Sequence, residues 1–321
     1  MSGILITGGT GFVGNHLIAH LKDGNSRIAV LSSGGSSARV SGVDYYEADI
    51  RDANVVQSIV REVRPEKIFH LAGISDVASS WKDPRLTFEV NVLGTLNLFE
   101  AAMSLPRPPR ILNVSTAQVY APASGGLSEE SRIAPDNPYA ASKAMAELLR
   151  VPYLKCATGG IVTARSFNHT GPGQSDKFVL SSIARQFAEI QAGDRSPKLI
   201  VGNIDVERDF TDVRDVVEAY CLLLEKGRAG EIYNVCSGSA VRLADIIKIF
   251  ESVSGTKVEL EKDPARIRPN EAATVSGSAE KIQVDAGWRP RIPLKQTISD
   301  LLEYWRLRIS SEVAQSPATE R

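Results

Sequence analysis

Short apolar runs alternate with amphipathic segments over the first 165 residues. The apolar runs lie at Gly3–Thr7, Arg27–Leu31, Lys67–Gly73, Ile111–Thr116 and Gly160–Arg165, and the mixed segment Val43–Ala48 is predicted to be a further strand. Runs that are apolar at nearly every position are typical of strands buried on both faces of a parallel sheet. Between them, apolar residues recur at helical spacing, as at Val13, Leu17, Ile18 and Leu21, over Ala53–Val63 and over Pro84–Met103. The alternation predicts a doubly wound α/β fold with a parallel sheet.

The pattern changes after residue 165. Helical spacing predicts helices at Phe178–Ala192, Asp212–Glu225, Leu243–Val253 and Leu294–Leu307, with strands at Lys198–Val201 and Glu231–Val235. We assign residues 1–165, together with about 203–238, to the first domain. Residues 166–202 and 239–310 are predicted to form a smaller C-terminal α/β lobe that closes over a ligand, and 311–321 to form a polar tail.

Three glycines separate the first strand from the first helix. Gly8, Gly11 and Gly14 are three residues apart, which lets the backbone turn tightly and approach a pyrophosphate. The strand before them and the amphipathic helix after them are the context that makes such a triplet informative. The sequence therefore predicts a dinucleotide site in which the turn and first helical residues, Gly8, Thr10, Gly11, Phe12, Val13 and Gly14, contact the cofactor.

The loop after the second strand bears on the choice of cofactor. An acidic residue there would bond the ribose 2′-hydroxyl of NAD, but this chain has serines from Ser32 onward and an arginine at Arg39. Hydroxyl groups and a guanidinium suit a 2′-phosphate, so the sequence favours NADP (NADPH), with NAD possible. A polar loop with Arg39 in solvent fits the residues equally well. Further cofactor contacts are predicted at the carboxyl ends of the next two strands, at Asp49, Ile50, Leu71, Ala72 and Gly73.

Tyr139 and Lys143 lie four residues apart, just after Pro138, at the start of an apolar-periodic segment. Residues at this spacing share one face of a helix. An ammonium group beside a phenol stabilises the phenolate and lowers the pKa of the phenol. This motif predicts a proton donor or acceptor at Tyr139, although a solvated surface pair has the same spacing.

Composition excludes several classes of protein. The chain has 321 residues, 43% hydrophobic and 23% charged, with a net charge of −1, so no overall field favours nucleic acid or an anionic membrane. Its three cysteines, Cys156, Cys221 and Cys236, are too scattered for zinc or disulfides, and no metal site is expected. No signal peptide and no apolar run near 20 residues is evident. A cytoplasmic protein is expected.

Together with Asn91 and the segment around Thr116, these features make the chain resemble the extended short-chain dehydrogenase/reductase family, which acts on nucleotide sugars. The resemblance extends to about Arg308 and implies a Rossmann-type sheet. It implies Thr116, Tyr139 and Lys143 as catalytic residues, with Tyr139, Lys143 and Asn91 also touching the cofactor. It further implies a homodimer built on the Tyr139 helix and the helix near Asn91. The family's glycine after the segment at 115–120 is Ala121 here.

The second half is similar to members that act on GDP-linked sugars. The segment at 165–174, the stretch from Gly202 to Asp215 and the block at 268–271 carry this similarity. It implies that the substrate contacts Ser75, Thr116, Gln118, Asn168, Arg208, Arg268 and Glu271. We interpret His169 as a packed loop residue, and the segment around Trp288 as structural.

The residue at position 118 separates the reactions that share this scaffold. The family's 4,6-dehydratases carry a carboxylate there, and an amide such as Gln118 cannot exchange protons at neutral pH. The resemblance therefore implies reduction of the C4 keto group of GDP-4-dehydro-6-deoxy-D-mannose to GDP-D-rhamnose, with Tyr139 as the acid. A nucleotide-sugar 4-epimerase with bound NAD and a GDP-mannose 4,6-dehydratase are the alternatives. A non-catalytic NAD(P)-sensing regulator would commonly lack the Tyr–Lys pair.

Overall fold

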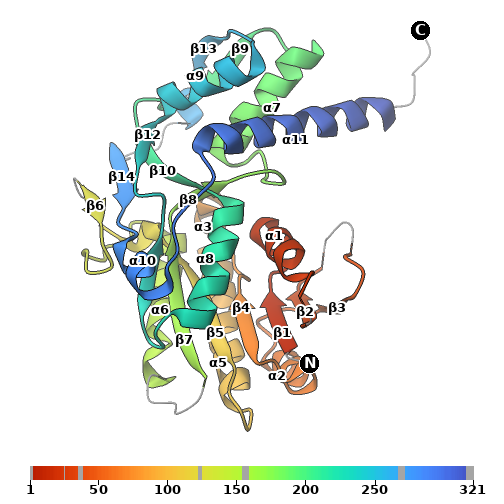
Figure 1. Ribbon diagram of the computed structural model, residues 1–321, viewed down its shortest axis with the longest axis vertical. Helices are drawn as coiled ribbons and strands as arrows, with labels where there is room; N and C mark the ends of the chain where they lie inside the picture. Colours follow the sequence, from red (N-terminus) through yellow and green to blue (C-terminus); the bar gives the residue numbers. More distant parts are fainter. Residues whose placement is uncertain are drawn as a thin grey trace.

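A seven-stranded parallel sheet forms the larger part of the molecule (Figure 1). The computed structural model describes residues 3–24, 26–34, 39–121, 125–153, 159–266 and 272–315. The strand order is β11-β7-β5-β4-β1-β2-β3, and every neighbouring pair is parallel. The strands are β1 (Gly3–Thr7), β2 (Arg27–Ser32), β3 (Val43–Glu47), β4 (Lys67–His70), β5 (Arg110–Thr116), β7 (Gly160–Ser166) and β11 (Ile232–Val235). This confirms the predicted fold class.

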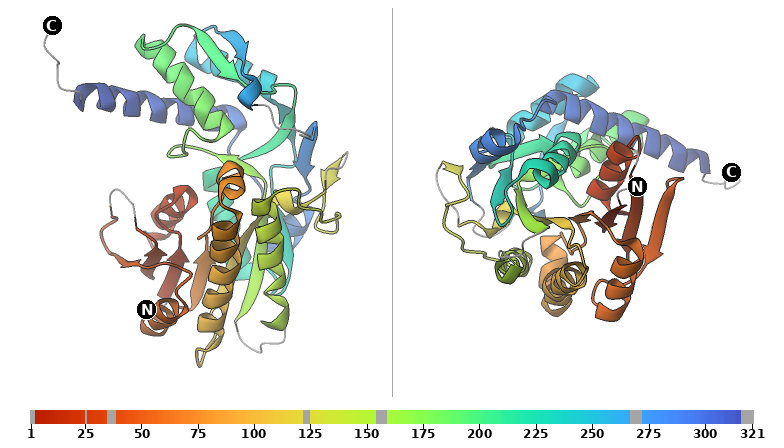
Figure 2. Two further views of the ribbon diagram at one scale, coloured as in Figure 1. Left: turned by 180° about the vertical axis from the view of Figure 1, so that it is seen from behind. Right: turned by 60° about the horizontal axis from the view of Figure 1, so that its bottom comes forward.

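Helices cover both faces of this sheet because successive strand residues point to opposite sides. Ile4 and Ile6 pack with α1 (Phe12–Leu21), α8 (Val213–Lys226) and α10 (Glu280–Ala286), whereas Leu5 packs on the other side. That side is covered by α2 (Ala53–Val63) and α5 (Gly94–Met103), with α6 (Pro138–Leu148) beside them (Figure 2).

The smaller lobe lies over the carboxyl-terminal edge of the sheet (Figure 1). Its helices, α7 (Val179–Ala192), α9 (Leu243–Ser254) and α11 (Leu294–Gln315), share a separate apolar core that includes Phe187, Phe250 and Trp305. A five-stranded sheet connects the lobe to the larger unit. It contains β6 (Gly126–Leu127), β8 (Asn168–Thr170), β10 (Glu207–Asp212), β12 (Ala240–Arg242) and β14 (Thr274–Gly277). Strands β9 (Lys198–Val201) and β13 (Glu259–Lys262) pair at the periphery.

The structure differs from the sequence prediction at several boundaries. Strand β4 ends at His70 rather than Gly73, so the small residues that follow form a loop. The predicted helix over Pro84–Met103 is α4 (Pro84–Phe88), a π-helical turn η1 (Glu89–Leu93) and α5, with the separate short helix α3 (Val77–Lys82) before it. Helix α11 continues to Gln315, beyond the predicted end at Leu307 and into the predicted polar tail. Within the described residues, no helix is long and apolar enough to cross a membrane.

Candidate active site

The glycine turn after β1 has a backbone that side chains would obstruct. Gly8 has a φ of +69°, and a Cβ placed on it would lie 2.7 Å from the amide nitrogen of Ala72. A Cβ on Gly14 would clash with the carbonyl oxygen of Gly9. Helix α1 begins after Gly11 without a side-chain cap, so the amides of its first turn are available to an anion. The turn therefore has the open backbone and the available amides that a diphosphate needs, and the contact of residues 8–14 with a dinucleotide stays a prediction.

We expect Gly8→Ala to weaken NADPH binding by about tenfold or more, a loss of at least ~1.4 kcal/mol. The new methyl group would push the turn away from the loop at Ala72. Gly42→Ala is the matched control, because Gly42 also has a positive φ (+82°) but has open space where its Cβ would be. Fluorescence titration with NADPH measures the dissociation constant of each variant. Equal losses in the two variants would show that backbone strain, not the turn's shape, is responsible.

The end of β2 carries the residues that were expected to distinguish the cofactors. Ser32 ends the strand, and the Arg39 guanidinium carbon lies 5.5 Å from the centroid of the Tyr45 ring. Glu47, which was not among the predicted site residues, is paired with Ser32 in register at the end of β3. A Cβ on Gly34 would lie 2.6 Å from the Glu47 carboxylate, so an acidic group is present at this corner after all. The preference for NADP stays a prediction.

Two further strand ends border the same edge of the sheet. Asp49, after β3, binds Arg51 at 2.6 Å, and these hydrogen bonds lower the pKa of the Asp49 carboxyl group. Ile50 is buried under Gly94, where an added Cβ would lie 2.6 Å from it. The loop Leu71–Gly73 follows β4 and passes beneath the glycine turn. Asp49 and Ile50 follow β3, whereas Leu71–Gly73 lie in the loop after β4 and not in the strand that was predicted to include them. The contact of these residues with the cofactor stays a prediction.

Thr116, Tyr139 and Lys143 come together at the end of β5. Asn137 caps α6 by accepting a hydrogen bond from the Ala140 amide at 2.9 Å, and Pro138 occupies the first turn. This start places Tyr139 and Lys143 on the buried face of α6. The Tyr139 hydroxyl lies close enough to the Thr116 side chain for Thr116 to lower its pKa. Lys143 Nζ donates to the carbonyl oxygen of Val114 at 2.8 Å and lies 3.4 Å from a Cβ placed on Gly73.

The prediction that Lys143 lowers the pKa of Tyr139 was wrong for this structure. Burial raises the pKa of the phenol, and the nearby Thr116 side chain opposes the rise. Lys143 is itself buried, which lowers the pKa of its ammonium to about 8, although the Glu147 charge raises it. Tyr139 therefore keeps its proton at neutral pH, and this is the form that can donate one.

Asn91 lies in the π-helical turn and holds the loop after β4. Its amide nitrogen donates to the carbonyl of Ile74 at 3.0 Å and to the Ser142 hydroxyl at 2.9 Å. Its amide oxygen accepts from the Ile74 amide at 2.8 Å and lies 2.9 Å from a Cβ placed on Gly73. Irregular turns of this kind are frequent at functional sites. Asn91 thus shapes the floor below the expected cofactor position.

The structure describes five of the seven predicted substrate residues. Ser75, Gln118 and Asn168 are exposed, and Gln118 accepts a hydrogen bond from Asn137 at 3.5 Å. Arg208 Nη1 donates to the carbonyl of Glu207 at 2.8 Å. Arg268 and Glu271, like Cys156, lie outside the described residues. The contact of all the predicted substrate residues with a substrate stays a prediction. Within the described part of the chain, no group of acidic, histidine and cysteine side chains could hold a metal ion.

The segment after β7 joins the glycine turn to the lobe. The His169 ring stacks on the Phe12 ring, with centroids 6.2 Å apart, and His16 Nε2 bonds the Pro172 carbonyl at 2.8 Å. Nδ1 of His169 donates to the Phe167 carbonyl at 3.0 Å, which agrees with its interpretation as a packed loop residue.

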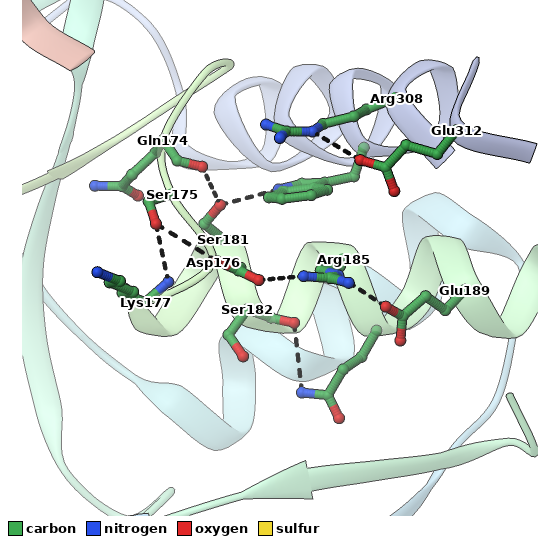
Figure 3. A network of polar contacts seen from close by, with 12 residues as sticks. Gln174, Ser175, Asp176, Lys177, Ser181, Ser182, Arg185, Glu189, Arg308 and Glu312 are labelled. Carbon is green, nitrogen blue, oxygen red and sulfur yellow. Dashed lines mark hydrogen bonds and ion pairs between the residues drawn. The ribbon is translucent and has the colours of Figure 1, made fainter. Parts of the chain in front are cut away.

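Farther along this segment, Ser181 on α7 anchors the chain at Gln174 (Figure 3). The Ser181 hydroxyl donates to the Gln174 carbonyl at 2.6 Å and accepts from Trp305 Nε1 on α11 at 2.9 Å. Arg185 pairs with both Asp176 and Glu189 beside it. The C-terminal helix thereby braces a loop that borders the site.

His70 is a buried residue at the site that the sequence analysis did not select. It is 1% exposed, and burial together with the nearby Lys143 charge lowers its pKa to about 3. We expect stability to fall as the pH drops below about 6.5, because the unfolded chain then takes up a proton that the folded chain does not. Between pH 7 and 4 the loss from this residue is roughly 3 kcal/mol.

Thermal unfolding of wild type and His70→Gln at pH 8, 6 and 4.5 checks this expectation. The variant should lose less stability on acidification than wild type does. Burial also lowers the pKa of His169, so some acid sensitivity should persist in the variant. Parallel curves for the two proteins would contradict the assignment.

The comparisons with known proteins agree with this geometry. The family described as GDP-mannose 4,6 dehydratase matches residues 5–301. The chain is 36% identical to a GDP-6-deoxy-D-mannose reductase from Pseudomonas aeruginosa over 312 residues, covering 96% of this chain and 99% of that one. The chain belongs to the extended short-chain dehydrogenase/reductase family. It is thus an NAD(P)-dependent enzyme of the nucleotide-sugar-modifying class.

Two solved structures of family members resemble this one closely. RMD from Pseudomonas aeruginosa complexed with NADPH superposes with a TM-score of 0.85 at 35% identity, covering 96% of this chain and 100% of that one. UDP-glucose 4-epimerase from Thermus thermophilus in complex with NAD gives a TM-score of 0.83 at 30% identity, covering 95% and 99%. Both cofactors therefore occur among relatives of similar fold.

Proposed function

We propose that the protein reduces the C4 keto group of GDP-4-dehydro-6-deoxy-D-mannose to GDP-D-rhamnose with NAD(P)H. The observation that carries the proposal is a buried Tyr139 beside Thr116, with Gln118 at the position where the dehydratases of the family carry a carboxylate. The 36% identity to the Pseudomonas reductase supports the same substrate.

The side chains divide the reaction between them. The cofactor, when bound, supplies the hydride for the C4 carbon. Tyr139 donates its proton to the oxygen of the same carbonyl, so that hydride and proton together convert C=O into CH–OH. Thr116 holds this oxygen beside the phenol. Lys143, whose Nζ lies 3.4 Å from a Cβ placed on Gly73, would bind the nicotinamide ribose, and its positive charge would stabilise the phenolate that forms when Tyr139 gives up its proton.

Two related reactions are the alternatives. A 4,6-dehydratase must move the C5 proton and expel the C6 hydroxyl, and the amide of Gln118 cannot do this work. A 4-epimerase uses the same Thr–Tyr–Lys set but keeps its NAD bound, and the NAD complex of the Thermus epimerase makes this the stronger alternative.

Incubation with NADPH and GDP-4-dehydro-6-deoxy-D-mannose tests the proposal. We expect loss of absorbance at the NADPH band with formation of one GDP-6-deoxyhexose, whose C4 configuration is read by NMR. NADH in place of NADPH measures the cofactor preference. Interconversion of nucleotide sugars without net oxidation of the cofactor would establish the epimerase instead. Dehydration of GDP-mannose would establish the dehydratase.

We also propose that two copies associate through α6 and the neighbouring helix at η1. The apolar side chains of Leu93, Met145 and Leu148 are exposed on these elements, at 51%, 48% and 65%. Light scattering after gel filtration should show a dimer for wild type and a monomer for Leu148→Glu, because a buried charge opposes association. Val284→Glu, at a 75% exposed residue on α10, is the control that should remain dimeric. A monomeric wild type would refute this interface.

A further inference from the structure

A series of buried hydrogen bonds joins the loop after β4, against which the glycine turn packs, to the helix that carries Tyr139; at Asn91 it passes from the backbone carbonyl to the side-chain amide. It runs through residues on β1, β4, α5, η1 and α6 in the order Ala72 amide, Thr7, His70, Thr95, Asn91, Ser142 and Tyr139 carbonyl. The five side chains from Thr7 to Ser142 are each at most 2% exposed. Water therefore does not compete for these bonds.

The chemistry of the groups sets the direction of every bond around His70. Thr95 donates its only proton to the carbonyl of Asn91 at 2.6 Å, so it must accept from His70 Nε2 at 2.9 Å. Because His70 is neutral, its Nδ1 carries no proton and accepts a hydrogen bond from the Thr7 hydroxyl, with Oγ1 and Nδ1 2.7 Å apart. The Thr7 oxygen in turn accepts from the Ala72 amide at 3.2 Å. Only one tautomer of His70 satisfies all its neighbours.

Both ends of the chain lie at the site. Ala72 is the residue against which Gly8 packs, so the first bonds determine how far the glycine turn stands from the loop after β4. At the other end, Asn91 bonds the Ser142 hydroxyl at 2.9 Å, and Ser142 bonds the Tyr139 carbonyl at 2.7 Å. A shift at Thr95 would thus reach the backbone of the acid without touching either ligand.

We propose that His70 and Thr95 are positioning residues. They hold the end of α6 that carries Tyr139 at a fixed position relative to the glycine turn and the loop after β4. They act after both ligands are bound, by keeping the acid within reach of the carbonyl that receives hydride. The proposal takes the role of Tyr139 from the proposed function.

Thr95→Val and Thr95→Ser test this role. Valine has nearly the shape of threonine but cannot accept from His70 or donate to Asn91, whereas serine keeps the hydroxyl. We expect Thr95→Val to lower kcat about 10- to 100-fold, since small misplacements of catalytic groups have effects of this size. The dissociation constant for NADPH should change less than about twofold. Thr95→Ser should retain most of the activity.

Thr87→Val is the matched control. Thr87 is also fully buried, and its hydroxyl bonds the carbonyl four residues earlier, at Asp83, as Thr95 does at Asn91. It lies outside the chain of bonds, so Thr87→Val should lower the melting temperature without lowering kcat. Equal kcat values for Thr95→Val and Thr87→Val would overturn the proposal.

Hydrogen exchange gives a readout that needs no turnover. Amides in α6 should exchange faster in Thr95→Val than in wild type or Thr87→Val, and unchanged protection of α6 would also overturn the proposal. If wild type does not reduce the ketosugar, the proposed function is wrong, but the proposal about Thr95 and α6 is not thereby contradicted. The exchange experiment then still decides whether Thr95 holds α6 in place.

Discussion

Tyr139→Phe is expected to lower turnover by about 10³- to 10⁴-fold, at the upper end of what a positioned proton donor contributes. The phenol is buried beside Thr116 and burial raises its pKa, so it carries the proton that the new hydroxyl group needs. Phenylalanine fills the same space without this proton. Dissociation constants for NADPH and for the ketosugar should change by less than about threefold.

Tyr233→Phe is the matched control for this variant. Its hydroxyl is also buried in the fold, but it bonds Asp285 and the amide of Arg228, away from Tyr139. Turnover should stay close to the wild-type value. Stopped-flow mixing of enzyme, NADPH and ketosugar separates the chemical step from binding. A Tyr139→Phe enzyme that keeps a tenth or more of the activity would assign the proton to another donor.

Glu147→Gln is expected to destabilise the fold by about 3–5 kcal/mol, the usual cost of leaving a buried charge without its partner. Glu147 follows Lys143 by one helical turn and accepts from Arg165 Nε at 3.0 Å, Arg165 Nη2 at 2.7 Å and Ser115 Oγ at 2.5 Å. The side chains of the ion pair are each 5% exposed. Its loss would leave the Arg165 cation uncompensated and lower the pKa of Lys143 further.

Urea unfolding of wild type, Glu147→Gln and Asp44→Asn measures this difference. The Arg27–Asp44 pair is about half exposed on each side, so its loss should cost only about 0–1 kcal/mol. Replacing both buried partners by apolar residues, as Glu147→Leu with Arg165→Met, should cost less than Glu147→Gln, because no charge is then left alone. Equal losses for Glu147→Gln and Asp44→Asn would contradict this account.

Much of the sheet could be predicted because each of its strands has a local signature. Gly3–Thr7 has the predicted bounds, and β9 does as well. The first of these, in the seven-stranded sheet, is buried at every position, so its pattern needs no knowledge of its neighbours. Strand β9 lies in the peripheral two-stranded sheet, and its apolar residues after Lys198 give it a short apolar run. The short strands of the smaller lobe escaped prediction for the opposite reason. Strand β6 has two residues and β12 has three, and such lengths carry no period.

The candidate site was predictable where one segment carries the chemistry. The glycine turn and the Tyr139–Lys143 pair each lie within a few residues of chain, and a helix or turn dictates their geometry. Glu47 was missed because it reaches the end of β2 only through the pairing of β3 with that strand. His70 was missed because a histidine in an apolar run gives no indication of its partners.

The sequence by itself determined the fold class, the position of the dinucleotide turn and the residues expected to react, because spacing along one strand, turn or helix is a local property. Only the tertiary structure decided the protonation of the site. Burial raises the pKa of Tyr139 and lowers those of Lys143 and His70, against the expectation for an exposed pair. Burial and hydrogen-bond partners come from segments distant in the chain, so spacing cannot encode them.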